Sequence, residues 1–180
     1  MSMDGTSMDD TEKQIGPVVA ASHLASGPMP ALSELEFALT MIVNAYHRWI
    51  ERCMAASGSE GLGPLDVIVL HSVNHRGRAK TLSDICLVLN VEDTHTVAYA
   101  LKKLENAGLV ASGKRGKEKI AEITPAGEAA CIEYKRLREA LLIKPLKALG
   151  LDESELSQVA TTLRMVSGNY DQAARAAAAM

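Results

Sequence analysis

The side chains best suited to chemistry in this sequence are the cationic and polar groups between residues 94 and 119. Nine basic and five acidic residues fall between Arg76 and Lys119, although the whole chain has a formal net charge of −3. Positive charge gathered in one segment attracts phosphate, which is the basis of most DNA binding. Uneven surface charge without a function gives the same pattern, so charge alone leaves both interpretations open.

A helix over residues 94–106 would have two unlike sides. At 100° per residue, Val97, Leu101 and Leu104 fall together and are predicted to face the core. The opposite side would carry polar and cationic groups, as a helix in the major groove requires. An ordinary amphipathic surface helix is the alternative. The residues predicted here to contact DNA are Thr94, His95, Thr96, Tyr99, Lys102 and Lys103.

A basic hairpin is predicted directly after this helix. Short strands are expected at 109–111 and 120–123, around a loop over 112–119 that contains two glycines. Its cations, predicted to contact phosphates, are Lys114, Arg115, Lys117 and Lys119. Arg115, near the tip, could enter the minor groove. The alternative is a solvated charged turn.

Capping signals predict the helices that must position these groups. Pro64 opens a helix whose expected buried residues are Leu65, Ile68, Val69 and Val73. Thr81, with Asp84 three residues later, is typical of a capping box before a short helix that ends near Asn90. Asp93 would cap the 94–106 helix, and Gly108 would end it in the left-handed conformation.

Long helices are predicted on both sides of this module. The first runs from Ser33, as its N-cap, to Ala56, and it is apolar around most of its circumference, so it needs cover on two sides. The second begins at Thr124–Pro125, and Pro145 is expected to kink or split it. A last helix follows a capping signal at Asp152 and carries Leu156, Val159, Leu163, Val166 and Tyr170.

Together these elements predict a mainly α-helical fold with a small two-stranded β-wing, a winged helix-turn-helix flanked by long dimerisation helices. The expected parts are a flexible tail over 1–32, an N-terminal dimerisation helix over 33–62, the winged helix-turn-helix over 63–124, C-terminal dimerisation helices over 125–172 and a frayed tail over 173–180.

Residues 62–128 resemble the MarR (multiple antibiotic resistance regulator) family. The resemblance is carried by Gly63–Pro64, by Thr81-Leu-Ser-Asp-Ile, by the stretch from Thr96 to Val110, and by Ile123-Thr-Pro-Ala-Gly127. It implies a homodimer that binds double-stranded DNA and regulates transcription. It also implies a small-molecule effector between the dimerisation layer and the DNA module. The residues predicted to line that cleft are Tyr46, Trp49, His71 and His75.

The wing departs from the family pattern, in which an Asp two residues before an Arg braces it. Here the stretch reads Lys114-Arg-Gly-Lys-Glu-Lys119, without such an Asp. Two acidic residues, Glu92 and Asp93, also precede the predicted recognition helix. A second class of function is therefore considered: a winged-helix module that binds protein and does not read DNA.

The other chemistry-bearing residues favour neither an enzyme nor a cofactor. No phosphate-binding glycine loop, nucleophile elbow or pair of carboxylates appears. His71 and His75 have the spacing of a metal pair, but no third ligand lies nearby, so two surface histidines are favoured and no metal is predicted.

The cysteines are too widely spaced for a disulfide framework, which indicates reduced thiols and a cytoplasmic protein. Cys53 is interpreted as a packed thiol, with a redox role as the alternative. No secretory signal and no membrane span are expected.

Overall fold

The computed structural model describes residues 16–180, and the chain divides into two compact units between Trp49 and Ile50. The first unit holds a short helix, α1 (Ser22–Ala25), and most of α2 (Pro30–Ala56). Ser33 is not the N-cap of α2, because the helix starts at Pro30; the Ser33 hydroxyl instead donates to the Leu24 carbonyl at 2.5 Å. The fixed φ of proline suits the first helical position. Of the predicted tail over 1–32, residues 1–15 lie outside the described part.

The second unit contains the predicted helix-turn-helix. It consists of α3 (Pro64–Asn74), a 3-10 turn (His75–Gly77), α4 (Leu82–Leu89) and α5 (Thr94–Asn106). Thr81 and Asp84 form the predicted capping box, with Asp84 N–H donating to Thr81 Oγ1 at 3.1 Å. Asn90 ends α4 at a φ of 53°, and Gly108 follows α5 at a φ of 72°. Both positions need the left-handed conformation that Asn and Gly tolerate best.

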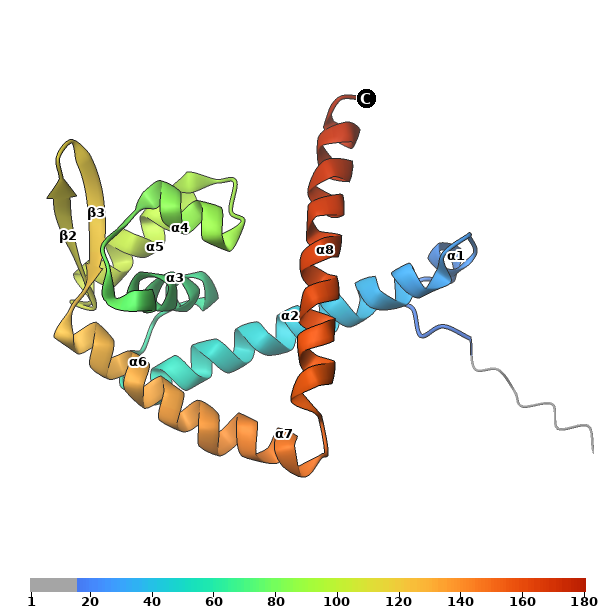
Figure 1. The fold of residues 1–180 in the computed structure, drawn as a ribbon, viewed down its shortest axis with the longest axis horizontal. Helices are drawn as coiled ribbons and strands as arrows, with labels where there is room; N and C mark the ends of the chain where they lie inside the picture. The colour runs from blue at the N-terminus through green and yellow to red at the C-terminus, as the bar shows by residue number, and fades with distance from the viewer. Residues whose placement is uncertain (1–15) are drawn as a thin grey trace, which may run out of the picture. The chain divides into compact units, whose positions relative to one another are not determined.

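The two predicted strands of the wing pair with each other, and a short third strand that was not predicted joins them in an antiparallel sheet with the order β1-β3-β2. The strands are β1 (Lys80–Thr81), β2 (Val110–Arg115) and β3 (Glu118–Ile123). β2 and β3 stand side by side next to α5, and both reach further towards the tip of the hairpin than predicted (Figure 1). A two-residue strand shows no periodicity, which is why the sequence did not reveal β1.

The core of this unit lies around α3, which packs against α5, α6 and β3. Its largest fully buried side chains are Ile50, Met54, Val67, Val69, Leu70, Val73, Ile85, Val97 and Leu104. Leu65 and Ile68, predicted for the buried face of α3, are only half-buried, whereas Val67 and Leu70 are fully buried. A helix covered on several sides buries more than one stripe of residues. A prediction based on a single stripe therefore placed Leu65 and Ile68 in the core and missed Val67 and Leu70.

Three helices follow the sheet. They are α6 (Pro125–Arg138), α7 (Lys144–Ala148) and α8 (Glu153–Ala178), with a π-helical turn over Glu139–Ile143. Pro145, predicted to kink or split this helix, is the second residue of α7, and the π turn lies directly before α7. α8 continues through the alanines expected to fray from Ala173, because alanine is the best helix former. None of the helices in the described part of the chain is long and apolar enough to cross a membrane.

Candidate nucleic-acid interface

The two predicted sides of α5 are present. Val97 and Leu104 are fully buried, together with Ala100, and Leu101 is half-buried. The side chains on the other side, which are Thr94, His95, Thr96, Tyr99 and Lys102, are exposed, and Tyr99 has 71% of its surface accessible. The Asp93 carboxylate accepts from His95 N–H at 2.9 Å, so it caps the helix. A large aromatic ring left in solvent beside a lysine is available to a partner surface.

Lys103 is placed differently from the other predicted DNA contacts. Its Nζ lies 2.6 Å from Oδ2 of Asp66 on α3, and the side chain is only 37% exposed. No local pattern in the sequence points to Asp66 as a partner, because the two residues are 37 positions apart in the chain. This ion pair occupies Lys103 on the flank of α5 that faces α3.

The hairpin presents its cations at and near its tip. Lys114, Arg115 and Lys117 are all exposed, and Lys114 pairs directly with Lys119 across the strands. Gly116, at a φ of 66°, makes the turn. Arg115 Nη2 lies 3.4 Å from Glu118 Oε2, its direct cross-strand neighbour. Glu118, which was not among the predicted site residues, therefore offers Arg115 a carboxylate from the opposite strand.

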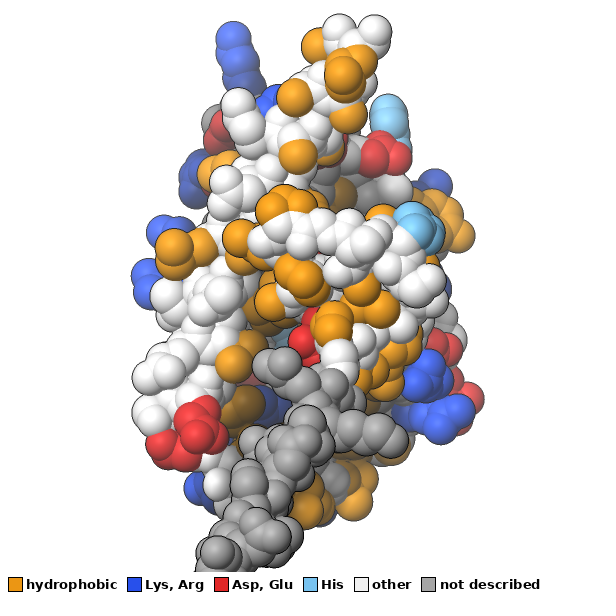
Figure 2. All heavy atoms as spheres, turned by 90° about the vertical axis from the view of Figure 1, so that its right-hand side faces the viewer, with side chains coloured by type: hydrophobic (Ala, Val, Ile, Leu, Met, Phe, Trp, Pro, Cys, Tyr) orange, Lys and Arg blue, Asp and Glu red, His pale blue; other side chains and the backbone are white. Residues whose placement is uncertain are grey.

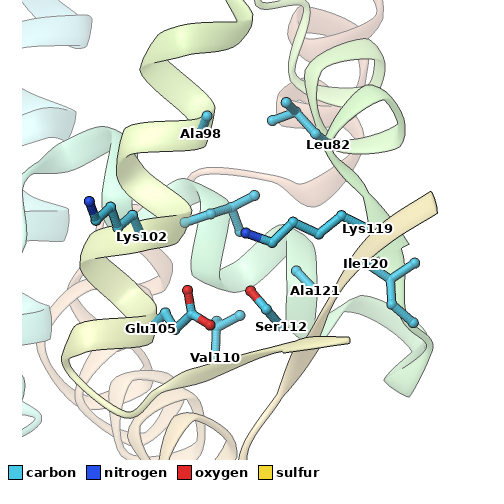
Figure 3. A pocket seen from close by; sticks show the side chains of 10 residues that line it. Leu82, Ala98, Lys102, Glu105, Val110, Ser112, Lys119, Ile120 and Ala121 are labelled. Atoms are coloured by element: carbon cyan, nitrogen blue, oxygen red, sulfur yellow. The ribbon is translucent and has the colours of Figure 1, made fainter. Parts of the chain in front are cut away.

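A groove of about 420 Å³ separates α5 from the hairpin. Its lining is mainly aliphatic, with Leu82 at one end and Val110 and Ala121 on the strands, as Figure 3 shows. Lys119 reaches across it from β3, and Lys102 and Glu105 border it on α5. The groove makes the surface between helix and wing concave, and it has both an apolar floor and cations at its edge.

Lys80 does not belong to this surface. It is 7% exposed, and its Nζ donates to the backbone carbonyls of Val73, His75 and Arg78 at 3.0, 2.6 and 3.1 Å. Burial, with a smaller effect of Arg78, lowers the pKa of Lys80. The lysine closes the C-terminal end of α3, where carbonyls lack helical partners.

The residues predicted to line an effector cleft fall in both units. In the first unit, Tyr46 is exposed and Trp49 is half-buried, and both lie on α2. In the second unit His75 is exposed, whereas the His71 ring packs edge-on against Tyr134 at 4.6 Å and its Nε2 is buried without a hydrogen-bond partner. His75 lies in the turn after α3, so the two histidines do not share one regular helix. In the described part of the chain no group of three or more potential metal ligands comes together.

All three cysteines are free and buried. Burial, with a smaller effect of Glu133, raises the pKa of Cys53, and its thiol lies 3.8 Å from the Tyr134 carbonyl. Burial also raises the pKa of Cys131 to about 11. A buried, protonated thiol is a poor nucleophile, so both geometry and ionisation favour packing over redox chemistry.

Comparison with known proteins agrees with this architecture. Residues 62–127 match the family described as winged helix DNA-binding domain. No curated protein matches the sequence. A cysteine-to-serine mutant of MarR from E. coli, solved with operator DNA, has a TM-score of 0.62 at 19% identity, over 78% of this chain and 99% of that one.

Two further solved structures have a TM-score of 0.61 at 15% identity. One is a MarR-family transcriptional regulator from Rhodococcus sp. RHA1, matched over 74% of this chain and 91% of that one. The other is CouR from Rhodococcus jostii RHA1 bound to p-coumaroyl-CoA, matched over 73% and 90%. At these identities the likeness is one of fold.

Proposed function

We propose that this chain is a dimeric, sequence-specific DNA-binding regulator of transcription of the MarR type. The match to a winged helix DNA-binding domain and the fold shared with solved MarR-family regulators support this proposal. The observation that carries the proposal is the outward face of α5, where Tyr99 and Lys102 are exposed beside a basic hairpin. This arrangement offers one element for base edges and another for phosphates. It needs no catalytic group, and we propose no enzymatic activity.

The two elements would divide the work of recognition. α5 enters the major groove, where Thr94, His95 and Tyr99 can meet base edges and Lys102 can reach a base or phosphate. The hairpin lies along the neighbouring backbone, where Lys114, Arg115 and Lys117 bind phosphates and fix the register. In this proposal the acidic Asp93 acts as the cap of α5, because its carboxylate is bound to the helix N-terminus.

A second copy of the chain is the proposed partner of α8. The apolar residues Leu156, Val159, Leu163, Val166 and Tyr170 recur at alternating spacings of three and four, which is the pattern of a helix–helix seam. None of the residues of α8 is buried, so a single chain leaves this seam incompletely covered. Figure 2 shows many hydrophobic side chains at the surface of the face it views. A two-fold dimer would cover the seam and present two copies of α5 to successive turns of DNA.

Control by a small-molecule effector belongs to the same proposal. CouR, of similar fold, was solved with a bound acyl-CoA. Tyr46, Trp49, His71 and His75 remain the predicted lining of an effector cleft. An effector regulates only if it binds the DNA-competent geometry and the DNA-incompetent geometry of the protein with different affinities.

We also propose that the regulator acts in the cytoplasm, where its DNA lies.

Selection from genomic fragments, followed by salt titration on the recovered DNA, tests the proposal. We expect one or a few fragments to be enriched, with a binding constant that falls steeply as salt increases. Tyr99→Ala should change which base pairs are preferred. A wild-type protein that binds no duplex in a salt-dependent manner would overturn the proposal and would favour a protein-binding winged helix instead.

A further inference from the structure

The ion pair between Asp66 and Lys103 lies near the C-terminal end of α5, the proposed recognition helix, on the side that faces α3 and outside the surface proposed to face DNA. Asp66 is 6% exposed, and its Oδ2 accepts both from Lys103 Nζ at 2.6 Å and from Gly63 N–H at 2.8 Å. The bond from Gly63 belongs to the N-terminal cap of α3. The carboxylate is therefore fixed by the backbone, unlike a mobile surface side chain.

The pair sits on one flank of α5, and the groove to the hairpin lies on the other. At 100° per residue Lys103 is about 100° from Lys102, while Lys102, Leu101 and Ala98 line the groove. Buried Val97 and Leu104 hold the back of the helix between these flanks. The buried stripe packs the back of the helix, and the ion pair adds a charge-assisted contact of 2.6 Å at one flank, where it opposes rotation of the helix.

We propose that Asp66 and Lys103 are positioning residues that set the rotation of α5 about its own axis, and so the aim of Tyr99 and Lys102. This inference rests on the proposed function, since it assigns these residues a role in DNA reading. A helix with side chains is about 10–12 Å across, so a turn of about 20° moves its surface by about 2 Å. Contacts to base edges tolerate about a quarter of that movement.

The proposal reverses the role that the sequence suggests for Lys103. A lysine that binds phosphate contributes about one unit to the slope of the logarithm of affinity against the logarithm of salt. A lysine held by Asp66 contributes to specific affinity through geometry and leaves that slope unchanged. The two roles also disagree about Asp66: if Lys103 is a DNA ligand, removing its competitor frees it and strengthens binding.

Three variants test this in the full-length protein: Lys103→Met, Asp66→Asn and the double variant. Asp66→Asn leaves an amide oxygen to accept from Gly63 N–H, so the α3 cap survives. Dissociation constants are measured for the best genomic fragment recovered by the wild type and for a scrambled duplex of equal length. Lys103→Arg, which can retain the pair, and Lys102→Met, on the exposed face, are the matched controls.

We expect each single variant to reduce the ratio of specific to scrambled affinity about tenfold, and the double variant to reduce it no further. The salt slope should stay at its wild-type value in Lys103→Met but fall by about one in Lys102→Met. Lys103→Arg should keep the wild-type ratio of specific to scrambled affinity. Simple loss of stability would weaken binding to both duplexes equally, so the ratio separates positioning from folding.

An unchanged ratio in Lys103→Met, or tighter binding by Asp66→Asn, would overturn the inference while leaving the regulator intact. Should Asp66→Asn fail to fold, the ratio and salt slope of Lys103→Met decide alone. If the wild type binds neither duplex, the proposed function itself fails, and this positioning role fails with it.

Discussion

His71 shows how a single titratable residue can link the stability of the winged-helix unit to pH. Burial lowers its pKa from the ordinary 6.5, and its Nε2 has no hydrogen-bond partner beside Tyr134. The folded state therefore binds a proton less readily than the unfolded state. Stability should fall as the pH drops below about 6.5, and the loss should level off only once the pH lies below the folded pKa.

Replacing His71 with phenylalanine should remove this pH dependence. The ring contact with Tyr134 is kept, and the buried nitrogen without a partner disappears, so stability at about pH 7.5 should rise by up to about 1 kcal/mol. Urea unfolding at about pH 7.5 and about pH 5.5, on either side of the ordinary histidine pKa, measures both effects. His75→Gln, at an exposed position, is the control and should retain the wild-type slope. A His71→Phe protein with that slope unchanged would contradict the prediction.

Gly127 is a second residue whose type is dictated by its surroundings. It lies in the first turn of α6, where its N–H donates to Thr124 Oγ1 at 3.0 Å, and a Cβ added there would overlap the carbonyl oxygen of Leu109. Gly127→Ala should destabilise the protein by about 3 kcal/mol, because backbone rather than a flexible side chain must move. Gly168→Ala on α8 meets nothing within 4 Å and should stabilise the protein slightly, by up to about 1 kcal/mol, because alanine favours helix more than glycine does. Thermal unfolding of the two variants compares them directly.

At the scale of elements, the β2–β3 hairpin allows its proposed role in DNA binding to be tested without disturbing the folded structure. Arg115 and Lys117 are exposed near a turn, so replacing both with alanine removes charge without opening the core. We expect affinity for every duplex to fall about tenfold or more, and the salt slope to fall by about two. Arg136→Ala on α6, where Arg136 pairs with Glu133, is the control. If the hairpin variant binds duplex DNA as tightly as the wild type does, the wing does not contribute to DNA binding.

The elements also show what the sequence can and cannot predict. The boundaries of α4 and α5 followed from local signals, because caps such as Thr81 and Asp93 act within one turn of the chain. The strand at Lys80 and the Asp66–Lys103 pair depend instead on residues far apart in the sequence. Charge counting grouped Lys80 and Lys103 with the DNA-facing cations, yet their Nζ atoms are bound to backbone carbonyls and to Asp66.

At the scale of the whole molecule, the apolar seam of α8 carries the proposed dimer. Glutamate at both Val159 and Leu163 would place charges in the seam, and burying them against a second copy would be costly. We expect this variant to be monomeric at concentrations where the wild type is dimeric, as measured by light scattering after size exclusion. Its affinity for a two-half-site fragment should fall far more than its affinity for a single half-site, because the two copies of α5 would no longer be linked.

Ser157→Glu combined with Thr161→Glu is the matched control, since these positions lie on the opposite side of the same helix and are exposed. It adds the same charge to α8 with little effect on helix formation, so it should remain dimeric. A monomeric wild type, or a dimer that survives glutamate at both seam positions, would show that another surface covers α8. If the seam variant alone dissociates and alone loses preference for paired half-sites, the spacing of the operator follows from the geometry of this helix pair.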